Sequence, residues 1–152
     1  MSLDDLQRAV DASLASASSL TREIFGKRAM DAASVQRFIN KVLGATVATV
    51  RADGRPHAAL VLAACSDGTV YFTASVGSVL LRNLEGRADV ALTVTDADHD
   101  VTIHGQARRL GMASQLPDLV TQLHHASKRG QFIPSGWDGY LYEVTIDKIF
   151  TS

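Results

Sequence analysis

Residues 45–73 read ATVATVRADGRPHAALVLAACSDGTVYFT, and this segment predicts three strands in succession. β-Branched and other apolar residues dominate three runs within it, as they do in strands: 45–51, 56–64 and 69–73. Asp53-Gly54 and Asp67-Gly68 separate the runs, and an Asp-Gly pair favours the tight turn of a hairpin. We therefore expect three neighbouring strands that form an antiparallel meander.

Three further strands are predicted beyond this meander, at 89–95, 101–109 and 140–150. By simple alternation, one face of the last strand carries Val144, Ile146 and Lys148. Six antiparallel strands with few, short helices predict a mainly β fold with flanking helices, built either as a barrel or as an α+β sheet.

Four segments are predicted to be helical: 4–16, 33–43, 79–85 and 112–128. The first has a thin apolar stripe and ends in the Ser-rich residues 15–20. The second carries a clear apolar face, and Gly44 follows it at the C-cap position.

Composition and charge exclude several classes of function. The 15 basic and 16 acidic residues leave a net charge of -1, which gives no electrostatic reason to expect nucleic acid or an anionic membrane as a partner. No apolar stretch approaches the roughly 20 residues needed to span a bilayer. Residues 1–5 lack the features of a signal peptide. We therefore expect a cytoplasmic location.

The titratable residues suggest neither a metal site nor a hydrolase. His124 and His125 are adjacent, so on a helix they diverge by about 100° and do not form a shared metal site. Cys65, the single cysteine, lies in an apolar run and is predicted to be structural. No nucleophile elbow of the Gly-x-Ser-x-Gly kind is present. Catalytic side chains are therefore left unassigned.

A candidate phosphate site lies where the loop 75–78 leads into the helix that carries Arg82. The first turn of a helix has free N–H groups and a dipole that favours an anion. Ser75 and Ser78 add hydroxyl groups, and Arg82 adds a charge-assisted contact. The same residues also suit a purely structural role, with Ser78 as the helix cap and Arg82 as a solvated surface residue. From these residues alone, both interpretations stay open.

The order of these segments resembles the pyridoxamine 5′-phosphate oxidase-like superfamily, the flavin- and deazaflavin-binding split barrels. The resemblance covers about residues 35–109 and rests on six segments: FINK at 38–41, ATVRADGRPH at 48–57, TVYFTA at 69–74, LRNL at 81–84, DVALTV at 89–94 and VTIHGQA at 101–107. It implies a six-stranded antiparallel split β-barrel of the FMN-binding type over residues 33–152, preceded by an N-terminal helical extension over residues 1–32.

The resemblance also implies a homodimer that binds FMN or a deazaflavin coenzyme at the subunit interface and acts as an oxidoreductase on a small organic substrate. Carried over to this chain, the ring lies along the second and third strands, and the phosphate lies beside the following loop and helix. The implied ring contacts are Ala58, Leu60, Val61, Tyr71, Phe72 and Thr73. The implied phosphate contacts are Ser75, Ser78, Arg82 and Asn83, with Gln106 and Trp137 as further cofactor contacts.

One position departs from the family pattern. Many members carry a lysine two positions before the arginine of the Arg-Asn-Leu segment, and here that position is Leu80. The missing cation leaves a deazaflavin, heme or no cofactor as alternatives to FMN, and a non-catalytic binding protein or a cofactor-free interaction dimer as alternatives to an enzyme. Trp137 and Tyr140 are predicted either to stack on the ring or to cover the end of the barrel.

Overall fold

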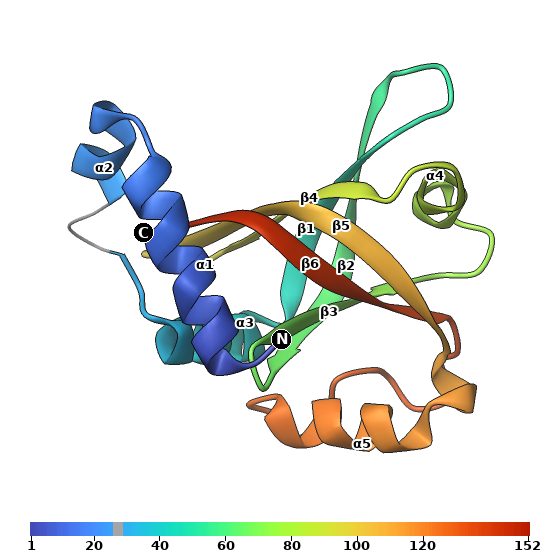
Figure 1. Cartoon of the computed structure of the whole chain (residues 1–152). Coiled ribbons are helices and arrows are strands. Elements are labelled where there is room, and N and C mark those ends of the chain that lie inside the picture. Colours follow the sequence, from blue (N-terminus) through green and yellow to red (C-terminus); the bar gives the residue numbers. More distant parts are fainter. Residues whose placement is uncertain (26–28) are drawn as a thin grey trace.

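Six antiparallel strands close into a barrel in the computed structural model, which describes residues 1–25 and 29–152 (Figure 1). The strands are β1 (Gly44–Val50), β2 (Pro56–Ser66), β3 (Thr69–Ala74), β4 (Asp89–Thr95), β5 (Asp100–Met112) and β6 (Tyr140–Thr151). Their spatial order is β1-β2-β3-β6-β5-β4, and β4 returns to pair with β1. The predicted six-stranded barrel with flanking helices is confirmed. Residues 26–28, inside the predicted extension over 1–32, lie outside the described residues.

Alternating side chains fill the barrel interior. On β5, Val101 and Ile103 are fully buried while Thr102 between them is partly exposed, as expected for a strand with one face on the core. Phe72 of β3 is also fully buried, and its ring stacks on that of Tyr142 of β6 with centroids 5.4 Å apart. This cross-strand contact reinforces the pairing of β3 with β6, where Phe72 and Tyr142 are register partners.

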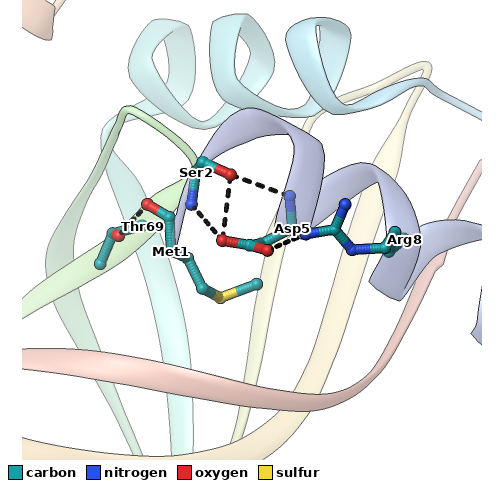
Figure 2. A network of polar contacts seen from close by, with 5 residues as sticks. All are labelled: Met1, Ser2, Asp5, Arg8 and Thr69. Carbon is teal, nitrogen blue, oxygen red and sulfur yellow. Dashed lines mark hydrogen bonds and ion pairs between the residues drawn. The ribbon is translucent and has the colours of Figure 1, made fainter.

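Helix α1 (Leu3–Ser16) packs along the outside of the barrel beside β6 (Figure 1). Leu6 and Val10 are buried in the core cluster, and the Ser13 hydroxyl accepts a hydrogen bond from the Ile149 amide at 2.9 Å. Figure 2 shows how the helix begins: Ser2 and Asp5 form a capping box, and Asp5 pairs with Arg8. The hydroxyl of Thr69 donates to the Met1 carbonyl and ties this helix start to β3.

Replacing Ser2 by alanine is expected to lower the free energy of unfolding by about 1 kcal/mol, because the cap is lost. The loss of stability in Ser2→Ala should be smaller in acid. Hydrogen bonds from the Ser2 amide and hydroxyl lower the pKa of Asp5, so the ionised Asp5 stabilises the folded state above the ordinary carboxyl range. This stabilisation is lost as the pH falls through the lowered pKa. Thermal unfolding at pH 7 and pH 3 measures both effects. Ser19→Ala, at an exposed serine, is the control, and equal losses in the two variants would contradict the assignment.

Two helical features differ from the sequence prediction. Helix α1 ends at Ser16, but a separate helix α2 (Ser19–Phe25) follows it, because the Ser18 hydroxyl accepts the Thr21 amide and caps a new start. Helix α3 (Ala32–Val42) is followed by a residue in the left-handed conformation, and this residue is Leu43, with φ 60°, and not the predicted Gly44. Burial of the Leu43 side chain and the bond from the Ala63 amide to its carbonyl hold this conformation in place.

The predicted helix over 112–128 is partly wrong. Strand β5 continues through Met112, a short 3-10 turn η2 (Ala113–Gln115) follows, and helix α5 (Pro117–Ala126) starts only at its proline. Proline suits the first turn of a helix and not its interior, which explains this start. Helix α4 (Val79–Gly86) lies near its predicted position, on the side of the barrel that carries the β1–β2 hairpin (Figure 1).

The predicted alternation of β6 fails at a bulge. His104 pairs with Lys148, but Gly105 pairs with Ile146, so Asp147 is an extra residue on β6. Beyond the bulge, Ile149 is buried and Lys148 is exposed. Gly105 permits this bend, because a Cβ atom there would collide with the Thr145 carbonyl oxygen.

Candidate functional site

The barrel splits where β2 leaves β3. Strand β2 pairs with β1 over 56–62 but with β3 only over 63–66. At the fork, the Thr73 hydroxyl accepts a hydrogen bond of 3.2 Å from the Leu62 amide. Amide directions alternate along a strand, so the backbone groups of Ala58 and Leu60 also point away from β1. In the described part of the chain, β3 does not pair with them, so this stretch of β2 is an open strand edge.

A pocket of about 410 Å³ lies at this fork, between β2, β3, the start of α4 and the segment before β6. Its lining residues are Gly44, Ala59, Leu60, Val61, Leu62, Thr73, Ser75, Ser78, Leu80, Pro134 and Trp137. None of these side chains is titratable. The pocket is therefore an apolar slot with three hydroxyl groups, two of which, those of Ser75 and Ser78, lie where the chain enters α4.

Half of the residues implied by the resemblance meet in this pocket: Leu60, Val61, Thr73, Ser75, Ser78 and Trp137. Sequence reasoning missed Gly44, Ala59, Leu62 and Pro134 as lining residues and noted Leu80 only as a departure from the family. Ala59 and Leu62 belong to the same strand as the predicted contacts and could have been included for that reason. Gly44 and Pro134 carried no signal, because only the tertiary fold brings them here.

The other six implied residues do not line the pocket. Phe72 is fully buried in the barrel core, and Tyr71 packs in the separate cluster beneath α5. The Asn83 side chain is buried and donates to the Thr49 hydroxyl at 3.0 Å, which ties α4 to β1. Gln106 donates to Asp89 and Asp147 on the outer surface. Ala58 and Arg82 are exposed, on β2 and α4 respectively.

Helix α4 directs its N-terminus at the polar end of the pocket. Ser78 is the N-cap, and its hydroxyl oxygen accepts the Leu81 amide at 3.1 Å. Its hydroxyl hydrogen remains available, so capping and ligand binding by Ser78 are compatible. Among the described residues, the amides of Val79 and Leu80 have no acceptor. Two free N–H groups, two serine hydroxyls and the helix dipole together form a site that favours an anion.

Leu80 lines the pocket and packs into the barrel core with only 2% of its surface exposed. A leucine here contributes apolar packing and no charge. The nearest arginine in the sequence, Arg82, is exposed and forms no ion pair with any residue that the structure describes. Among the described residues, Arg82 is thus an unpaired cation on α4, the helix whose N-terminus faces the anion-favouring end of the pocket.

The outer wall of the pocket is formed by the segment 128–138, which we call the wall segment. Phe132 and Ile133 anchor it in the buried cluster beneath α5, and Pro134 and Trp137 reach the pocket. The Trp137 ring lies over Gly139, where an added Cβ atom would come within 2.5 Å of it. Gly139 therefore gives the ring its place at the pocket.

The remaining candidates have structural roles. Burial raises the pKa of the Cys65 thiol to about 12, which removes the thiolate that a nucleophile requires. Within the described residues, no group of three or more His, Cys, Asp or Glu side chains is placed to hold a metal ion. No helix in the described ranges is long and apolar enough to cross a bilayer.

Comparison with known proteins identifies relatives of this barrel. The sequence profile described as pyridoxamine 5′-phosphate oxidase matches residues 32–135. A conserved hypothetical protein from Mycobacterium tuberculosis has a similar structure, with a TM-score of 0.64 and 18% identity over 80% of this chain and 84% of that one. No curated protein matches the chain.

Two further structures carry a named activity or ligand. An F420 reductase matches with a TM-score of 0.58 and 18% identity, over 75% of this chain and 94% of that one. An FAD-binding protein from Mycobacterium smegmatis matches with a TM-score of 0.54 and 18% identity, over 79% of this chain and 92% of that one.

Proposed function

Because this chain belongs to the pyridoxamine 5′-phosphate oxidase family, we propose that the pocket at the fork of β2 and β3 binds FMN or a deazaflavin coenzyme. The protein then acts as an oxidoreductase on a small organic molecule. The F420 reductase and the FAD-binding protein of similar structure support a cofactor of this class.

One observation carries the proposal: the pocket joins an apolar slot to an anion-favouring helix start. The slot runs along β2, where the backbone groups of Leu60 and Ala58 are free to pair with the polar edge of a flat ring. Ser75, Ser78 and the free amides of α4 lie at the other end, suited to a phosphate. A ring with a phosphate tail matches this order of groups.

The neutral lining of the pocket fits redox chemistry better than acid–base chemistry. No pocket residue is able to exchange a proton at neutral pH, so the pocket itself supplies neither a general acid nor a general base. A bound flavin or deazaflavin supplies hydride transfer. The protein's part is to orient the ring against β2, hold the phosphate at α4 and exclude water with Trp137 and Pro134.

A second copy of the chain is the partner that we propose for the open side of this site. Leu60 is 81% exposed and Val76 is 63% exposed, which is unusual for large apolar side chains. One borders the pocket and the other lies in the adjoining loop. A homodimer that covers them would bury this apolar surface and enclose the cofactor.

Replacing Arg82 by alanine is expected to weaken FMN binding about tenfold, the loss of one charge-assisted contact worth about 1.4 kcal/mol. Titration of the protein with FMN, followed by flavin fluorescence, measures the change. Arg87→Ala is the matched control, because Arg87 is equally exposed but lies at the far end of α4. Unchanged FMN affinity in Arg82→Ala would show that Arg82 does not contact the phosphate.

Leu80 favours a second candidate function, a protein that holds a cofactor without turnover. The buried leucine brings no positive charge to the part of the pocket proposed for the phosphate. Mixing the loaded protein with reduced nicotinamide or reduced deazaflavin distinguishes the two functions. Reduction of bound flavin and its reoxidation by an acceptor supports the enzyme, whereas a cofactor that stays oxidised supports storage.

A further inference from the structure

We infer that His124 is a positioning residue for this pocket, whose neutral imidazole holds the wall segment against α5 and so places Pro134 and Trp137. The inference rests on the proposed function only in that it takes the pocket to be a cofactor site. The placement of the wall segment is a property of the protein alone and is tested without a cofactor.

A single hydrogen bond from a helix side chain reaches the middle of the wall segment. The Nδ1 atom of His124 accepts the Phe132 amide at 2.7 Å. An imidazole nitrogen that accepts a hydrogen bond carries no proton, so this contact requires the neutral ring with its hydrogen on Nε2. Phe132 is only 3% exposed, and a buried amide without an acceptor is costly.

The contact sets the course of the chain toward the pocket. Phe132 and Ile133 are inserted beneath α5 beside Leu123, and Pro134 follows directly at the pocket rim. The Trp137 amide then donates to the Pro134 carbonyl at 3.2 Å, which turns the chain toward Gly139. Loss of the His124 contact therefore releases the part of the wall that closes the pocket.

The wall segment is also held at its far end. Both carboxylate oxygens of Asp138 bind Ser114, one at the amide and one at the hydroxyl. These hydrogen bonds, that of the hydroxyl first, lower the pKa of Asp138, so this clamp persists into more acid solution than an ordinary carboxylate would allow. The middle of the segment and its far end are therefore held by separate contacts.

The acceptor in this contact is the lone pair of His124 Nδ1. A side chain that replaces His124 therefore keeps the contact only if it places an acceptor at the same point.

Three variants separate positioning from simple packing. His124→Asn places Oδ1 where Nδ1 stands and keeps an acceptor. His124→Leu keeps apolar bulk but removes the acceptor. His125→Asn is the control, since His125 is exposed and its ring forms no hydrogen bond with any described residue. Trp137 is the single tryptophan, so the emission of the protein reports on its ring alone.

We expect His124→Leu to shift Trp137 emission to the red at pH 8 and to weaken FMN binding about tenfold. His124→Asn should stay within about twofold of the wild type. His125→Asn should match the wild type in both measurements. Equal behaviour of the leucine and asparagine variants would overturn the inference.

Amide hydrogen exchange keeps the test decisive if the leucine variant does not fold. The protection factor of the Phe132 amide should be at least tenfold lower in His124→Ala than in the wild type and should stay within about twofold of the wild type in His124→Asn; equal protection in the alanine and asparagine variants would overturn the inference. The two proposals also fail separately. Emission shifts without binding of either FMN or the deazaflavin coenzyme would contradict the proposed function alone, and coenzyme binding that is unchanged in every His124 variant would contradict the positioning role alone.

Discussion

Asn40→Ala is expected to lower the free energy of unfolding by roughly 3 kcal/mol, because two buried backbone groups lose their partners at once. The Asn40 side chain is 7% exposed and bridges α3 to β2. Its Nδ2 donates to the Cys65 carbonyl and its Oδ1 accepts the Cys65 amide, each at 2.7 Å. The substitution leaves both groups of Cys65 without a partner in a region that water does not reach, and Cys65 is fully buried.

Denaturant unfolding of Asn40→Ala beside Arg37→Ala measures this loss. Arg37 lies on the same helix, is exposed, and its side chain bonds only the neighbouring Ser34, so its replacement should change stability by less than about 0.5 kcal/mol. A loss below about 1 kcal/mol in Asn40→Ala would mean that the bridge does not join helix and barrel as described.

Ser78→Asp is expected to weaken FMN binding on the order of 100-fold, because a carboxylate would stand beside the bound phosphate. Aspartate is as good an N-cap as serine, so α4 keeps its start and the fold stays intact. The loss therefore reports on charge at the anion-favouring end of the pocket and not on helix stability.

Two comparisons isolate this charge effect. Ser78→Asn caps the helix without a charge, and its FMN affinity should stay within severalfold of the wild type. Riboflavin lacks the phosphate, so its affinity should be the same in the aspartate and asparagine variants. An equal loss of riboflavin binding in Ser78→Asp would place the effect on the ring and contradict the phosphate assignment.

Local signals accounted for most of the fold. The alternating runs and Asp-Gly turns predicted every strand within a few residues, because a strand with one buried face needs that alternation. The β6 bulge was not predicted, because it depends on the close approach of Gly105 to Thr145 on the neighbouring strand. The cap at Leu43 escaped for a similar reason: tertiary burial overrode the preference for glycine.

Pocket residues that lie close together in the sequence could be predicted, but those that only the tertiary fold brings to the pocket could not. Ser75 and Ser78 were found because a loop before a helix suggests an anion site from local sequence alone. Phe72 and Asn83 were implied by their positions in a family pattern, but the direction of each side chain decides its role. Phe72 points into the core, and Asn83 bonds Thr49. Pro134 comes from a distant segment, whose packing beneath α5 no local pattern predicts.

Titration of the purified protein with FMN, followed by its absorption spectrum and fluorescence, tests the central claim most directly. The account predicts a shifted flavin spectrum that saturates near one FMN per chain, with riboflavin bound more weakly because it lacks the phosphate. The deazaflavin coenzyme, titrated in the same way, identifies the alternative ligand of the same pocket. A protein whose spectrum and fluorescence ignore both coenzymes at millimolar concentration would contradict the account.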